Sequence, residues 1–270
     1  MNSETQDKVR AMLGMVDALY PTKSAGDLLT IQNPKTLKGA ESAGYIVGIV
    51  HLAAASLSGA NICAWSVNDC VAGCLTYAGQ GGIGLDASGL NRAQAARIRR
   101  TARAMLWGDA FGYDLRQEVV RLQQRANSMD LRVAIRLNGT SDIPWHRRDP
   151  DLVAWMRDNG IQQYEYTKRP VPDARDHGID TTYSYPGGKG IAAQRHLDAG
   201  NRVAVVFDTP KGHALPTEWQ APWGDTLRVI DGDKSDLRFL EPGGVVVGIR
   251  AKGRLKGKTG TRDGFLVAAA

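Results

Sequence analysis

Residues 44–53 read GYIVGIVHLA, an apolar and largely β-branched run that begins at a glycine. A short apolar run of this kind is typical of a strand that is buried on both faces. Segments of helical composition separate several further runs of the same kind, which lie at 131–139, 161–170, 179–188, 201–208, 226–233 and 243–253. Strands that alternate with helices predict βαβ units and a parallel sheet.

The number of runs suits either an open doubly wound sheet or a full or partial (β/α) barrel, and periodicity alone does not choose between them. The composition does not change abruptly along the 270 residues. We therefore expect one α/β domain over residues 21–255, after an N-terminal lead-in at 1–20 and before a basic C-terminal tail at 256–270.

The charge and hydropathy of the chain limit its surroundings and partners. No apolar run approaches the roughly 20 residues of a membrane helix, and the first residues do not have the pattern of a secretory signal. We expect a cytoplasmic protein with no membrane partner. The formal net charge is +6, and part of it is concentrated at Arg92, Arg97, Arg99, Arg100 and Arg103. This basic helix predicts either a nucleic-acid contact or simply a solvated face.

The cysteines of the chain are concentrated in one stretch. Residues 61–75 read NICAWSVNDCVAGCL and contain Cys63, Cys70 and Cys74, the only three cysteines in the sequence. Three thiolates suit soft or borderline metals. Three interpretations remain open: a structural zinc site completed by a distant histidine, a [4Fe–4S] cluster with one open iron, and small buried apolar side chains. The polar neighbours Asn68 and Asp69 favour a metal site over the third interpretation.

Polar side chains follow strand after strand of the predicted sheet. We single out Asn138, Ser141, Asp142, Lys168, Arg169, Ser184 and Asp208. Each of these residues could be a turn former. However, the carboxyl ends of parallel strands face the ligand crevice, and the cysteine stretch follows the first strand of the sheet. The sequence therefore predicts that the cysteines and these polar residues share one edge of the sheet.

Several long segments resemble the phage "gene product 88" family, which implies no particular activity. They lie at 28–53, 63–79, 136–145, 164–170 and 229–253. More distantly, the layout is similar to radical S-adenosylmethionine (SAM) enzymes. In those enzymes a three-cysteine loop after the first strand of a partial (β/α) barrel binds a [4Fe–4S] cluster, and SAM chelates the open iron. The spacing differs: this chain has Cys-x6-Cys-x3-Cys, and the usual radical SAM pattern is Cys-x3-Cys-x2-Cys.

The distant resemblance implies a radical SAM-like barrel and a set of roles. Cys63, Cys70 and Cys74 would bind the [4Fe–4S] cluster. The remaining residues would bind SAM or face the substrate: Asn138, Ser141 and Asp142 at the amine or ribose, Lys168 and Arg169 at the carboxylate, and Ser184 and Asp208 on later strands. The sequence does not indicate a substrate. The alternative function is a nucleic-acid-binding phage protein with a structural metal site at the three cysteines.

Overall fold

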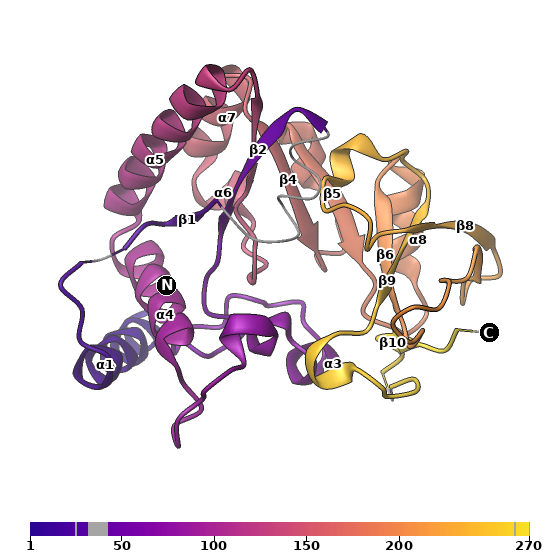
Figure 1. Cartoon of the computed structure of the whole chain (residues 1–270), viewed down its shortest axis with the longest axis horizontal. Helices are drawn as coiled ribbons and strands as arrows, with labels where there is room; N and C mark the ends of the chain where they lie inside the picture. Colours follow the sequence, from indigo (N-terminus) through magenta and orange to yellow (C-terminus); the bar gives the residue numbers. More distant parts are fainter. Residues whose placement is uncertain (25, 32–42, 262, 270) are drawn as a thin grey trace.

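The stretch at 44–53 forms strand β2 (Tyr45–Val50), whose six residues are all buried. The computed structural model describes residues 1–24, 26–31, 43–261 and 263–269. Part of the 28–53 segment that resembles the gene product 88 family, at residues 32–42, lies outside the described residues. Strand β2 pairs in parallel with β3 (Arg132–Arg136), and each later run of the sequence analysis contains one further strand (Figure 1).

The described strands form one mostly parallel sheet. Its order is β1-β2-β3-β4-β5-β6-β9-β8-β7, and β10 also pairs with β6. The bounds of the strands not yet given are β1 (Leu29–Thr30), β4 (Gln162–Thr167), β5 (Ile179–Ser184), β6 (Arg202–Phe207), β7 (Glu218–Gln220), β8 (Thr226–Asp231), β9 (Val246–Arg250) and β10 (Leu266–Val267). Only β1–β2 and β7–β8 are antiparallel among the described pairs. The predicted parallel α/β domain is therefore confirmed.

Strands β2 to β6 are neighbours in the same order as in the sequence. Since these strands are parallel, the loops that follow them leave the sheet at one edge, which we call the carboxyl edge. The path of described strands ends at β1 on one side and at β7 on the other, so these strands do not close into a complete barrel.

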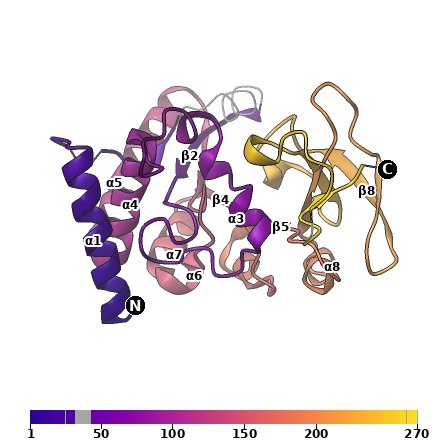
Figure 2. The ribbon, with the colours of Figure 1, turned by 90° about the horizontal axis from the view of Figure 1, so that it is seen from below.

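Helices join the strands and cover the sheet. Helix α5 (Gly108–Ser128) packs on β2 and β3, α7 (Pro150–Asp158) on β4, and α8 (Ile191–Asp198) on β5 and β6 (Figure 1). A short helix, α6 (Trp145–Arg148), precedes α7. The predicted lead-in forms α1 (Ser3–Leu19), which packs against α4 (Arg92–Leu106) (Figure 2). The predicted C-terminal tail supplies β10.

The alternation of side chains along β2 explains its continuous apolar run. Ile46 and Val50 belong to the core cluster that contains Leu115, Val119 and Leu122 of α5. On the other face of the strand, Tyr45, Val47 and Ile49 pack with Leu237 and Phe239, in the connection between β8 and β9. A strand that is covered on both faces is apolar at every position, as is typical of parallel sheets. Among the described helices, none is long and apolar enough to cross a membrane.

Candidate functional site

The cysteine stretch lies between β2 and α4 and crosses the carboxyl edge next to the loop after β3. Its elements are helix α3 (Asn68–Ala72) and the single turns η1 (Leu75–Tyr77) and η2 (Gly79–Gly81). The amide of Asp142 donates to the carbonyl of Ile62 over 2.9 Å. The Cys63 thiol lies 3.9 Å from the carbonyl oxygen of Thr140. The cysteine stretch and the polar segment after β3 are therefore in direct contact.

All three cysteines are free and partly buried. Burial raises the pKa of the Cys63 thiol to about 11. A hydrogen bond from the amide of Ala55 acts to lower this pKa, whereas the nearby Cys74 and Cys70 act to raise it. Burial also raises the pKa of Cys74, and Cys70 adds to that effect, whereas Arg97 and Lys168 oppose it. The three thiols thus lie within electrostatic range of one another. Within the described residues, however, no three His, Cys, Asp or Glu side chains are arranged as a ready-made metal site.

A small cavity adjoins the cysteine stretch. Its volume is about 280 Å³, and its lining includes Ala55, Asn61, Val71 and Cys74. This volume would hold several water molecules or a compact inorganic group, because a water occupies about 30 Å³ of the liquid. Of the three thiols, Cys74 is the one that lines this space.

The polar residues after β3 form a buried hydrogen-bonded network. The Asn138 amide donates to the Ile143 carbonyl (2.9 Å) and to Glu165 (2.8 Å), while its oxygen accepts from the Ser141 hydroxyl (2.9 Å). Asp142 accepts from the Thr167 hydroxyl over 2.7 Å. These bonds join the end of β3 to the end of β4, so the network fixes the carboxyl edge at this point.

Arg169 lies at the centre of the same network. Its guanidinium donates to Asp142 over 3.0 Å and also to Glu165, and its side chain is 5% exposed. A buried cation of this kind is stable only when carboxylates and hydrogen bonds compensate its desolvation. Since Arg169 is already engaged by two carboxylates, it holds the edge together and does not face an open space.

Lys168 is a cation of this edge that acts on one of the thiols. Its ammonium donates to the Ser184 hydroxyl over 2.6 Å and lies 4.9 Å from the centre of the Phe265 ring. Its charge also acts on Cys74, as the direction of its effect on the thiol pKa shows. The Lys168 amide donates to Asp142 over 2.8 Å, so the buried network also sets the position of this lysine.

The model of the gene product 88 family matches residues 27–265. The chain belongs to the gene product 88 family. Neither the curated proteins nor the solved structures contain a significant match to it. The geometry of the carboxyl edge is therefore the main evidence for what this member of the gene product 88 family does.

The other predicted residues lie apart from the thiols or are engaged within the chain. The carboxylate of Asp208 accepts from the amide of Ala269 over 2.7 Å and lines a second, larger cavity. Four arginines of α4 bond to the chain itself: Arg97 to Thr76, Arg99 to Asp17, Arg100 to the Asp27 carbonyl and Arg103 to Asp114. Arg92 is exposed. Most of the predicted basic face thus helps to attach α4 to neighbouring segments.

The sequence analysis did not identify two features of the carboxyl edge. Glu165 bonds to both Asn138 and Arg169. The sequence could have indicated this role, because Glu165 is an acidic residue inside a strand predicted to be buried, and a buried carboxylate requires a partner. Leu255 packs against the cysteine stretch: a Cβ at Gly73 would lie 2.3 Å from the Leu255 Cδ1. Since this contact joins positions that are distant in the sequence, no local pattern could have indicated it.

Proposed function

We propose that this protein binds an iron–sulfur cluster at Cys63, Cys70 and Cys74, with a radical SAM-like enzyme as the working model. The observation that carries the proposal is the gathering of the only three thiols at the carboxyl edge of a parallel sheet. Ligand sites in open parallel α/β sheets lie at that edge. Three cysteine ligands leave one iron of a [4Fe–4S] cluster open to a ligand from outside the protein.

The donor chemistry fits such a cluster, and the geometry fits it if the loop closes further. Helix α3 contains five residues and none of them is buried. Beyond its own turns, α3 is held by few contacts, among them the bond from the Asp263 amide to Asp69 (2.8 Å). A segment with so few buried contacts can rearrange at low cost. Movement of α3 would change the position of Cys70 relative to Cys63, which lies against the fixed loop after β3.

The sheet order supports the radical SAM-like model. Parallel strands in sequential order, with helices packed along them, are the arrangement of a partial (β/α) barrel. In this model Lys168 and Ser184 meet the ligand of the open iron, with the Lys168 ammonium opposite a carboxylate such as that of SAM. The buried network acts indirectly in this model, because Asp142 accepts a hydrogen bond from the Lys168 amide and so positions the lysine. The other members of the network are Asn138, Ser141 and Arg169.

Anaerobic reconstitution with iron and sulfide tests the cluster. We expect about four irons and four sulfides per chain. Cys63→Ala, Cys70→Ala and Cys74→Ala should each lose most of both, because no spare cysteine exists. The matched control is Leu75→Ala, since Leu75 follows Cys74 in η1, is 56% exposed and does not line the cavity beside the thiols; it should keep its iron. If the protein instead contained one tightly bound zinc per chain and no sulfide, the iron–sulfur assignment would be rejected in favour of a structural zinc site.

A second assay tests the SAM-like model separately. Reductive cleavage of SAM takes one electron from an added reductant such as dithionite and one hydrogen atom from a C–H or S–H donor, and it yields methionine and 5′-deoxyadenosine. We expect the reconstituted protein to release both products, and Lys168→Met to weaken SAM binding without loss of iron. A cluster that neither binds nor cleaves SAM would retain the iron–sulfur assignment and reject the enzyme model.

The nucleic-acid-binding alternative has less support in this structure. It relies on the arginines of α4, four of which bond within the chain. Phosphate contacts make affinity fall steeply with salt. Salt-dependent binding of an oligonucleotide that Arg92→Gln weakens, in a protein that binds zinc without sulfide, would favour this alternative.

A further inference from the structure

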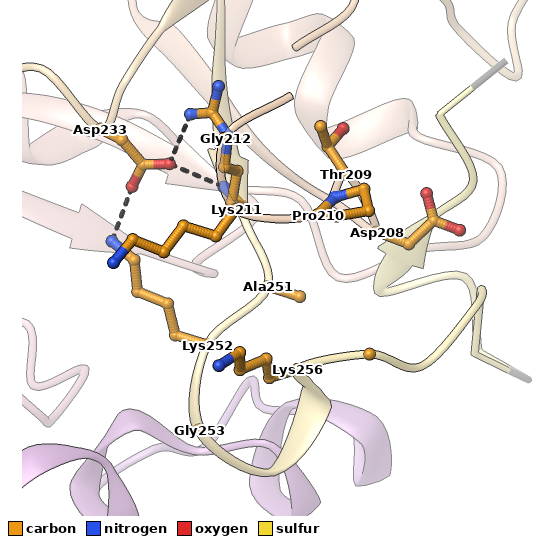
Figure 3. Close-up of a pocket in the computed structure, with 12 residues that line it drawn as sticks. Asp208, Thr209, Pro210, Lys211, Gly212, Asp233, Ala251, Lys252, Gly253 and Lys256 are labelled. Atoms are coloured by element: carbon orange, nitrogen blue, oxygen red, sulfur yellow. Dashed lines mark hydrogen bonds and ion pairs between the residues drawn. The ribbon is translucent and has the colours of Figure 1, made fainter. Parts of the chain in front are cut away.

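A second cavity, larger than the one beside the cysteine stretch, lies between the loop after β6 and the segment after β9 (Figure 3). Its volume is about 690 Å³. The lining includes Asp208, Lys211, Asp233, Arg250, Lys252 and Lys256, and no cysteine. Strands β6 and β9 are parallel neighbours, so the cavity opens at the carboxyl edge of the sheet. It has the position and the size of a small-molecule site.

The cavity contains more positive than negative side chains. Arg250 and Lys252 both bond to Asp233, over 3.0 and 2.6 Å (Figure 3). Lys211 and Lys256 form no ion pair with any described residue, and they belong to the two different segments that border the cavity. Asp208 is the second carboxylate of the lining, and Asp231, outside the lining, also pairs with Arg250 over 3.3 Å. Lys211 and Lys256 are thus the two cations of the lining that have no carboxylate partner among the described residues, and they border the same open cavity.

We propose that this cavity binds a small molecule that carries a phosphate group. A phosphate monoester has a charge of about −1.5 to −2 near neutral pH, so it could pair with the ammonium groups of both Lys211 and Lys256. Lysine ammonium groups bind phosphate as point charges. The cavity is much larger than a phosphate ion, so the phosphate carries an organic group that occupies the remaining space. The loops that border the cavity curve tightly, with positive φ at Gly212 (93°) and Gly253 (56°), where glycine is favoured.

This site is separate from the cysteine stretch. The turn η5 (Gly253–Leu255) contributes Gly253 to the cavity, whereas Leu255 packs toward Gly73 and the Arg254 guanidinium lies 4.2 Å from the centre of the Tyr77 ring. One turn therefore borders the cavity on one side and the cysteine stretch on the other. Because no thiol lines the cavity, ligand binding there does not depend on a cluster.

Titration calorimetry with AMP and adenosine tests the proposal, since the two probes differ only in the phosphate. We expect AMP to bind at least about tenfold more tightly than adenosine, and inorganic phosphate to compete with it. Lys211→Gln and Lys256→Gln should each weaken AMP binding about fivefold or more, because each removes one cation from the phosphate. Both side chains are exposed, so the thermal unfolding temperature should not change.

Lys258→Gln is the matched control, because Lys258 is exposed on the same segment and does not line the cavity. It should bind AMP as the wild type does. Equal affinity for AMP and adenosine, or AMP binding that both lysine variants leave unchanged, would overturn the proposal. Binding of a single-stranded oligonucleotide but not of AMP would also overturn it. Cys74→Ala should retain AMP binding, which separates this result from that of the cluster test.

Discussion

The loop after β3 and the loop after β2 touch at the carboxyl edge, but the chain holds them in opposite ways. The first is fixed by a buried network in which Asn138, Asp142 and Arg169 each make several hydrogen bonds. The second carries Cys70 on a five-residue helix that buries none of its residues, with Cys63 before this helix and Cys74 after it. The difference suggests that the loop after β3 is a rigid support and that the loop after β2 can rearrange.

The largest expected effect comes from breaking the rigid side. Arg169→Leu would leave Asp142 and Glu165 buried without their cation, and loss of one partner of a buried pair costs about 3–5 kcal/mol. Urea denaturation would measure the change in the free energy of unfolding. The control is Arg157→Gln, since Arg157 is half-exposed and, among the described residues, forms its ion pair with its neighbour Asp158 alone. It should change the free energy by less than about 0.5 kcal/mol. Equal effects of the two variants would refute the rigid-support interpretation.

Asn138→Ala should have the next largest effect. The variant leaves the Ile143 amide and one Glu165 oxygen without the bonds that Asn138 provides. Unsatisfied buried groups cost about 1–3 kcal/mol. Ser141→Ala removes one bond to the Asn138 oxygen, which still accepts from the Ile143 amide, so we expect about 1 kcal/mol or less. The same denaturation series measures both variants. A larger loss in the free energy of unfolding for Ser141→Ala than for Asn138→Ala would contradict the interpretation that Asn138 is the more central residue of the network.

Gly73→Ala tests the adaptable side. A Cβ at this position would lie 2.3 Å from the Leu255 Cδ1, so either the leucine or the loop must move. Overpacking costs about 1–3 kcal/mol, and we expect about 1 kcal/mol because α3 can shift. In a Leu255→Ala background the methyl group has room, and the same substitution should cost less. A double-mutant cycle without coupling between the two positions would show that the loop and η5 do not constrain one another.

The sequence indicated the strands well because their signal is local. The apolar runs at 44–53, 131–139 and 201–208 contain β2, β3 and β6, since strands covered on both faces need apolar side chains at nearly every position. The short strands β7 and β10 were missed, because two or three residues give no periodic pattern. Whether the sheet closes into a barrel also has no local signal, since it depends on the pairing of its outermost strands.

The site was predictable in its position but not in its roles. Asn138, Asp142 and Arg169 follow strand ends, and that placement predicted one shared edge. Whether such a side chain faces a ligand or a neighbour depends on partners far along the chain. Arg169 bonds to Asp142, 27 residues away, and to Glu165 inside a strand. Lys168 and Arg169 are adjacent in the sequence and still point to different surroundings, since neighbouring positions of an extended chain alternate in direction.

The smallest expected change in the free energy of unfolding concerns Asp233, which lines the cavity between the loop after β6 and the segment after β9. Burial acts to raise the pKa of Asp233, but hydrogen bonds from Lys252 and Arg250 outweigh it, so the pKa lies below its ordinary value. An acid whose pKa is lower in the folded state stabilises the fold above its unfolded pKa, about 3.9, and loses that contribution as the pH falls through the folded pKa. Partly exposed ion pairs contribute about 1 kcal/mol or less.

Asp233→Asn should therefore lower the free energy of unfolding by about 1 kcal/mol or less at pH 7. Because wild type and variant differ only by this carboxylate, the gap between them should stay constant from pH 7 to about pH 5 and narrow below about pH 4. The control is Asp176→Asn, because Asp176 is exposed and makes no hydrogen bond or ion pair with any described residue; its gap should be near zero throughout. A gap for Asp233→Asn that widened toward acid pH would mean that the carboxylate destabilises the fold. The cavity would then be acidic in effect, and the excess of positive charge on which the phosphate proposal depends would be lost.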